Sequence, residues 1–171
     1  MEATTSSIAS TGVRCGAVTE HTGEYWLTID PTGRIAWPDA VTDAFGRTLV
    51  FSRWLHGCLI AAPEDVWQRI SSGVAPDMPA VEDLFFRRLT AGAQKVTVDS
   101  VGRCTVPRHL RDWAGIAEKG PVTVSAQGGW VEIWSQPRFT AYLDETMRGF
   151  APQLAATTRF GPTQADREGA R

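Results

Sequence analysis

The chain of 171 residues contains an internal repeat, and this repeat restricts the folds that are open to it. Residues 25–38 and 94–107 share the pattern Thr-apolar-Asp-x-x-Gly-Arg-x-x-x-Pro. A second stretch, 49–67, matches the apolar and glycine pattern of 121–139. Two copies of a unit of about 50 residues therefore span 23–70 and 93–143. A unit of this size buries little apolar surface alone, so we expect the two copies to share one core.

Each copy is predicted to begin with a β-hairpin. The first strand has the β-branched and aromatic content of strands, and the Asp and Gly of the motif suit a turn in which Gly takes a positive φ. Pro38 or Pro107 ends the returning strand, because proline cannot donate to a ladder. Short helices are then expected over 39–46 and 108–115, each followed by a second hairpin and another helix.

These elements predict a mainly β fold of the α+β class. The expected architecture is two tandem, pseudo-symmetric units that form a compact β-barrel with short helices packed outside. Pseudo-two-fold symmetry would place the two Asp-x-x-Gly-Arg turns in equivalent positions. The predicted segments are a flexible N-terminal extension (1–22), a first unit (23–70), a loop and connecting helix (71–92), a second unit with a C-terminal helix (93–150) and a flexible tail (151–171).

Composition and charge exclude several classes of protein. Nineteen acidic residues against 17 Lys and Arg give a net charge of −2, which argues against binding of nucleic acid by bulk positive charge. It leaves room for a few well-placed arginines. No apolar run approaches the roughly 18–20 residues of a membrane span. The N-terminus is polar and has no apolar signal core, so a cytoplasmic protein without a membrane partner is expected.

No chemistry of catalysis or metal binding is recognisable. The three cysteines and three histidines are scattered, and no CxxC occurs. There is no phosphate-binding glycine-rich loop, nucleophile elbow or recognisable pair of catalytic carboxylates. The sequence therefore predicts no catalytic residue, no metal site and no cofactor, and an enzyme is the least favoured function.

Four segments together resemble the MraZ family of bacterial transcriptional regulators, across about 23–145: GEYWLTIDPTGRIAWP, LHGCLIAAPEDVW, RLTAGAQKVTVDSVGRCTVPRHLRDWAGI and WVEIWSQPRF. The resemblance implies an AbrB-like swapped-hairpin barrel and ring-like homo-oligomers. It implies binding to short repeated double-stranded DNA boxes upstream of the division and cell-wall gene cluster, and hence association with the nucleoid. It also implies that the two turns carry the DNA contact, through Asp30 with Arg34 and Asp99 with Arg103.

The chemistry of these residues suits that role. Arginine can bind a guanine edge or a phosphate with two hydrogen bonds, and the adjacent aspartate can hold the guanidinium in a fixed direction. The alternative interpretation is that the Asp and Arg of each turn form only an exposed ion pair, which contributes about 0–1 kcal/mol to stability. Arg108 and Arg111, on the helix after Pro107, could contact phosphates or could equally form a solvated helix face.

Departures from the family pattern leave alternatives open. The helix after Pro38 carries Asp39 and Asp43 where a basic helix is usual. Copy one has four arginines against six acids, and copy two has six cations against four acids, so DNA contact is expected to rely on copy two. The first rival function is an oligomeric protein-interaction module on the same barrel that has lost specific DNA binding. An AbrB-like antitoxin is disfavoured by the presence of two copies.

Overall fold

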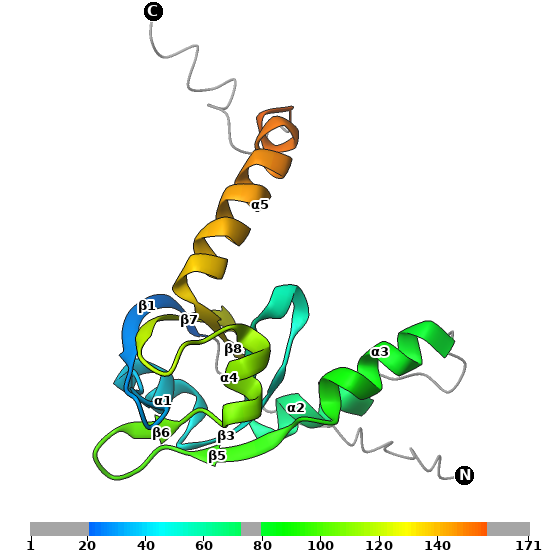
Figure 1. Cartoon of the computed structure of the whole chain (residues 1–171). Coiled ribbons are helices and arrows are strands. Elements are labelled where there is room, and N and C mark those ends of the chain that lie inside the picture. The colour runs from blue at the N-terminus through cyan, green and yellow to red at the C-terminus, as the bar shows by residue number, and fades with distance from the viewer. Residues whose placement is uncertain (1–20, 73–79, 157–171) are drawn as a thin grey trace, which may run out of the picture.

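The structure, a computed structural model, describes residues 21–72 and 80–156 (Figure 1). The expected flexible extension and tail lie mostly outside these described residues. The elements follow the chain in this order: β1 (His21–Ile29), β2 (Arg34–Ala36), α1 (Asp39–Phe45), β3 (Thr48–Arg53), the 3₁₀ helix η1 (Leu55–Gly57), β4 (Leu59–Ala62), α2 (Glu64–Ser72), α3 (Ala80–Thr90), β5 (Gln94–Thr97), β6 (Arg103–Thr105), α4 (Arg108–Ala114), β7 (Gly120–Gly128), β8 (Val131–Ser135) and α5 (Gln136–Ala156).

The predicted short helices are confirmed as α1 and α4, and the predicted connecting helix as α3. Pro38 and Pro107 stand at the N-caps of α1 and α4, and a glycine follows each helix. Gly115 adopts φ 62° and ψ 33°, the left-handed conformation in which glycine commonly ends a helix. α5 ends at Ala156, beyond the expected boundary at 150. The fold is α+β, with antiparallel strand pairs among the described residues.

The strands of the two copies are interleaved. Six of them form one sheet in the order β1-β7-β8-β4-β3-β5, and β2 pairs with β6 in a separate two-stranded ribbon. The first strand of each copy pairs with a strand of the other copy, β1 with β7 and β5 with β3. Exchanging each strand for its counterpart in the other copy gives the same order read backwards. Neither copy could therefore form its part of the sheet without the other.

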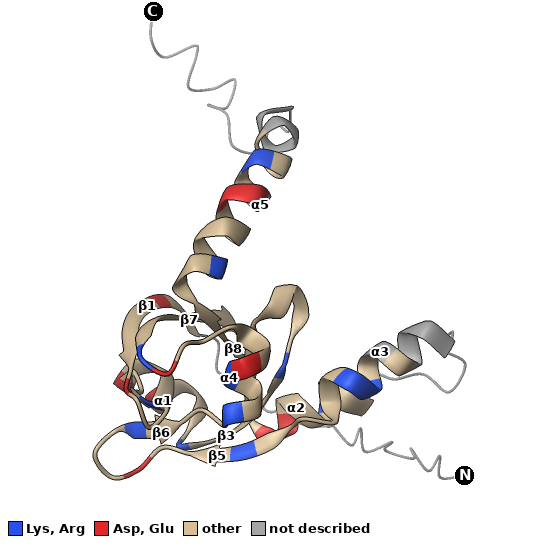
Figure 2. Ribbon diagram, viewed as in Figure 1, with Lys and Arg blue, Asp and Glu red and all other residues tan. Residues whose placement is uncertain are grey.

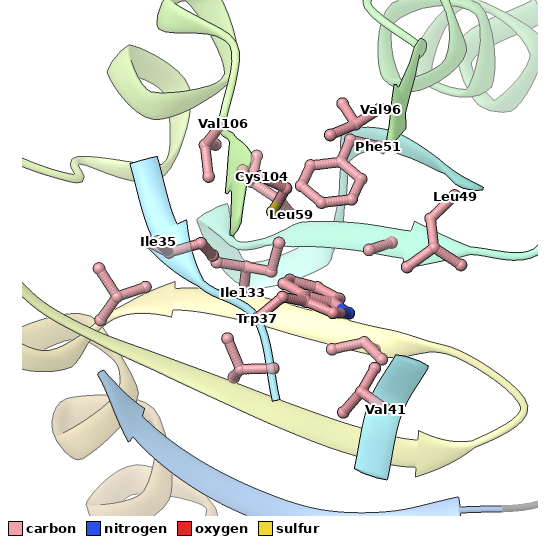
Figure 3. Close-up of a cluster of buried hydrophobic side chains, with 14 of the residues drawn as sticks. Ile35, Trp37, Val41, Leu49, Phe51, Leu59, Val96, Cys104, Val106 and Ile133 are labelled. Atoms are coloured by element: carbon pink, nitrogen blue, oxygen red, sulfur yellow. The ribbon is translucent and has the colours of Figure 1, made fainter. Parts of the chain in front are cut away.

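The main core lies between the inner face of the large sheet and the inner face of the ribbon. Figure 3 shows Ile35 and Cys104 from the ribbon meeting Phe51, Leu59 and Ile133 from the sheet. All five side chains are almost completely buried. Both copies contribute to this one cluster, as the repeat predicted, and full burial of a large apolar side chain contributes about 1.5–3 kcal/mol.

The outer face of the large sheet carries two smaller clusters. One joins Cys58, Trp134 and Phe139, and the ring of Tyr142 stacks on Trp134 at a centroid distance of 4.9 Å. The other gathers α2 on Ile60 and Ala62. The first turns of α5 are thus seated on the sheet, and the rest of that helix extends away from the body (Figure 1).

Glu132 lies between these two clusters, and its burial raises the pKa of its carboxyl group. A hydrogen bond from Trp134 Nε1 (3.1 Å) opposes this rise, as do the nearby indoles of Trp130 and Trp54. The Trp130 indole nitrogen makes no hydrogen bond of ordinary geometry among the described residues. A charged carboxylate at this place therefore costs stability at neutral pH.

Glu132→Gln is expected to be at least as stable as the parent at pH 7. The folded pKa lies above the unfolded value of about 4.3, so the parent loses stability as pH rises through the interval between these two values. Glutamine keeps an oxygen that can accept the Trp134 hydrogen bond without carrying charge. Urea unfolding at pH 4 and 7 tests this, with the exposed Glu118→Gln as control. A parent that gains stability over the variant as pH rises would contradict it.

Candidate nucleic-acid interface

The two motif turns, turn one (residues 30–33) and turn two (residues 99–102), have the same backbone geometry. In each, the amide of Asp donates to the carbonyl of Arg four residues later, at 2.9 Å for Asp30 and 2.8 Å for Asp99. Gly33 and Gly102 adopt φ 82° and 74°, which glycine accepts without the Cβ strain of other residues. The pattern Asp-x-x-Gly is thus required by the turn itself.

The aspartates act mainly on the backbone of their own turn. Asp30 Oδ1 accepts hydrogen bonds from the Thr32 amide (2.8 Å), the Thr32 hydroxyl (2.6 Å) and the Arg34 amide (3.0 Å). Asp99 Oδ1 accepts from the amides of Val101 (3.0 Å) and Arg103 (2.8 Å). We expected each aspartate to hold the guanidinium of its own arginine, but these bonds go to main-chain groups and a hydroxyl instead.

An ion pair joins the turns of the two copies. Arg34 Nη2 lies 3.3 Å from Asp99 Oδ2, with both side chains partly exposed. Among the described residues, the guanidinium of Arg103 makes no hydrogen bond or ion pair. Arg34 is therefore held in direction by the opposite turn, while Arg103 keeps all its donors available.

These contacts lower the pKa of both aspartates. The Thr32 hydroxyl hydrogen bond is the largest cause at Asp30, and the Arg103 amide hydrogen bond is the largest at Asp99. A folded pKa below the unfolded value means that the stabilisation is complete above about pH 3.9. It is lost as pH falls through the lowered folded pKa.

The amide proton shifts of Arg34 and Arg103 are expected to titrate at a pH below 3.8, the ordinary value for aspartate. NMR titration between about pH 2 and 5 measures the midpoints. In Asp30→Asn the titration at Arg34 should disappear while that at Arg103 remains. Midpoints at or above the ordinary value would show that the hydrogen bonds do not favour the charged carboxylates.

The β2–β6 ribbon brings the two arginines to one surface. Its register pairs Arg34 with Thr105 and Ala36 with Arg103, and these four residues form its exposed face. A small recess of about 140 Å³ lies at this face, lined by Thr28, Asp30, Arg34, Ile35, Ala36 and Arg103. Residues separated by 69 positions in the chain thus share one concave surface with two cations.

Arg108 and Arg111 lie on α4, and the structure packs α4 against turn one. A Cβ added to Gly33 would meet the guanidinium of Arg111, at 2.8 Å from Cζ. The amide of Val106, just before α4, donates to the Gly33 carbonyl at 2.9 Å. Arg108 is exposed, and Arg111 is partly buried with an unpartnered Nε. The structure therefore brings Arg111 of copy two next to the turn of copy one.

Sequence reasoning missed two residues at turn two. Arg47 Nη1 donates to the Asp99 carbonyl at 2.7 Å. Asp39, at the start of α1, lies beside Gly102, whose added Cβ would stand 3.9 Å from Asp39 Oδ1. The repeat could have pointed to Asp39, because it occupies the position of Arg108 in the other copy. No pattern in the sequence places Arg47 near Asp99.

Two further properties concern the described part of the chain alone. No group of His, Cys, Asp and Glu in it has the arrangement of a metal site. None of its helices combines the length and apolar character needed to cross a bilayer. The ribbon of Figure 2 shows Lys or Arg on β5 and charged residues of both signs on α4.

Comparisons with known proteins identify the family of the chain. A family model described as "MraZ protein, putative antitoxin-like" matches residues 89–160. "Transcriptional regulator MraZ" of Thermus thermophilus is 35% identical over 127 residues, covering 73% of this chain and 88% of the relative. "Transcriptional regulator MraZ" of Heliobacterium modesticaldum is 38% identical over 122 residues, covering 70% of this chain and 84% of the relative. That of Treponema denticola is 32% identical over 144 residues, covering 82% and 99%. The identity extends over most of this chain and most of each relative, and the chain therefore belongs to the MraZ family.

Proposed function

We propose that the chain is a sequence-specific DNA-binding transcriptional regulator. Its proposed DNA interface consists of Asp30, Arg34, Asp99, Arg103, Arg108 and Arg111. The observation that carries the proposal is the exposed face of the β2–β6 ribbon, where Arg34 and Arg103 line one recess. A two-stranded ribbon fits the major groove, and arginine is the side chain best suited to guanine edges and phosphates. The relatives are named transcriptional regulators, which agrees with the prediction that the chain is not an enzyme.

The finer parts of the proposal follow from the family. We propose two tandem AbrB-like units, at 23–70 and 93–150, in a swapped-hairpin barrel, which the exchange of β1 and β5 between the copies supports. The proposed targets are repeated boxes upstream of the division and cell-wall gene cluster. A protein with this role would be cytoplasmic and associated with the nucleoid.

Fluorescence anisotropy tests the proposed function. The full chain is titrated onto a duplex from the region upstream of its own gene and onto a scrambled duplex of equal length. The expected result is tighter binding to its own DNA, with the logarithm of the binding constant falling by about 0.9 per contacted phosphate for each tenfold rise in salt. Equal and weak binding to both duplexes would overturn the proposal.

We also propose a ring-like homo-oligomer, with α5 as a contact between subunits. Leu143, Met147 and Phe150 are exposed at spacings of four and three residues, which places them on one face of the helix. An apolar stripe on a projecting helix gains stability when a second surface covers it. Light scattering should give an oligomer for the parent and a smaller species for Met147→Glu. An unchanged mass would remove α5 from the contact.

A second candidate is an oligomeric protein-interaction module without specific DNA binding. The acidic character of α1, with Asp39 beside turn two, favours it because this charge repels phosphate. Retention on heparin at low salt separates the two candidates. A DNA-binding regulator should be retained and released by salt, and an interaction module should pass through.

A further inference from the structure

Each motif turn lies against the short helix of the other copy. Turn one meets α4 through Gly33 and the guanidinium of Arg111, and turn two meets α1 through Gly102 and Asp39. Main-chain hydrogen bonds secure both approaches, from Val106 to the Gly33 carbonyl and from Trp37 to the Gly102 carbonyl, at 2.9 and 2.8 Å. The arrangement is symmetric in backbone and follows from the exchanged strands.

The charges on these two helices differ. The repeat places Arg108 of α4 at the position of Asp39 of α1 and Arg111 at that of Thr42. The next position is acidic in both helices, as Asp112 and Asp43, so α4 carries two arginines and one aspartate and α1 carries two aspartates. Among the described residues, the side chains of Arg108 and Arg111 make no hydrogen bond or ion pair. Two cations are already engaged at turn two, Arg47 with the Asp99 carbonyl and Arg34 with the Asp99 carboxylate. Arg103 follows that turn directly.

We infer that turn one and α4, contributed by different copies, form the principal phosphate-contacting surface of the chain, and that turn two is the weaker half. The inference rests on the DNA-binding function proposed above and adds to it which half of the site binds the DNA backbone. Each cation that neutralises a phosphate releases counterions and adds to affinity, whereas an aspartate facing the backbone opposes it. The chain therefore suits a DNA element contacted more strongly on one side than on the other.

A pair of charge changes at repeat-related positions tests this asymmetry. Arg108→Gln should lower the slope of log affinity against log salt by about 0.9, the loss of one phosphate contact. Asp39→Arg places a cation at the matching position beside turn two and should raise the slope by about the same amount. Arg69→Gln, on the solvent side of α2, is the matched control and should leave the slope unchanged. Anisotropy at four salt concentrations measures all three.

A pair of glycine variants tests the place of Arg111 without removing a charge. Gly33→Ala and Gly102→Ala impose similar backbone strain, because both glycines have positive φ. Only the Cβ at position 33 would displace the guanidinium of Arg111. Gly33→Ala should therefore weaken DNA binding several-fold more than Gly102→Ala. Thermal unfolding of both variants shows whether the backbone strain is indeed equal.

Methylphosphonate substitution identifies the phosphates concerned. Neutralising one phosphate at a time in the duplex should reveal positions that no longer matter in Arg108→Gln. The same positions should respond to Gly33→Ala and not to Gly102→Ala. The inference would be overturned if Gly102→Ala affected the same phosphates as Arg108→Gln. It would also be overturned if the salt slope were unchanged in Arg108→Gln and Asp39→Arg. In both cases the parent would still bind DNA. A parent that binds no DNA would overturn the proposed function and the inference with it.

Discussion

Arg34→Gln with Arg103→Gln in one chain is expected to lower affinity for the target DNA by about 10²–10⁴-fold, since each bidentate contact discriminates by about 1–3 kcal/mol. Both arginines stand on the exposed face of the ribbon, and both line the same recess. Arg34 is pre-oriented by its ion pair with Asp99, and the guanidinium of Arg103 makes no hydrogen bond or ion pair with any described residue. Glutamine removes the charge and the guanidinium fork while keeping a side chain of moderate length.

The lysine variants separate base readout from backbone contact. Arg34→Lys with Arg103→Lys keeps both charges but loses the planar fork, which matters at a guanine edge and much less at a phosphate. We expect this variant to keep most of the salt slope and to lose most of the preference for its own duplex over the scrambled one. If the glutamine variant binds like the parent with an unchanged oligomeric mass, the two turns are structural elements only.

Phe51→Ala is expected to destabilise the fold by about 3–5 kcal/mol, the range for removing a large aromatic side chain from a packed core. Phe51 is 1% exposed, lies in the cluster between sheet and ribbon, and its ring stands 5.7 Å from that of Trp37. The cavity would open between residues of both copies. Since small domains are stable by only about 5–15 kcal/mol, much of the margin would be lost.

Urea unfolding at fixed protein concentration measures this loss. The control is Leu84→Ala on α3, where the side chain is 56% exposed. It should change the free energy of unfolding of the subunit by no more than about 0.5 kcal/mol, the usual range for a surface position. A similar loss for both variants would mean that the loss does not come from the shared cluster.

Local features of the fold could be predicted because their causes lie within a few residues. The turns at Asp30 and Asp99 follow from an acceptor at the first position and a glycine at the fourth, and both are present. Pro38 and Pro107 set the starts of α1 and α4, and a glycine follows each. The repeat also predicted one shared core, and the buried cluster draws on both copies.

The partners of those features could not be predicted in the same way. The count of charges in each copy assigned the cations of α4 to the same DNA-contacting surface as turn two, because both lie in copy two. In the structure, Arg111 packs on Gly33 of turn one, and Asp39 stands beside Gly102 of turn two. Likewise, the arginine that faces Asp99 is Arg34, from the other copy.

The sequence by itself determined two Asp-x-x-Gly-Arg turns, the short helices after them and the membership of both copies in one core. Only the tertiary structure decided which helix lies against which turn. The residues that cause turns and helix ends act on main-chain groups only a few positions away, so these features can be recognised from the sequence. Strand pairing joins residues far apart, and a repeat makes the pairing within a copy and the pairing between copies equally compatible with the pattern. The choice belongs to the packed sheet, in which β1 joins β7 and β5 joins β3.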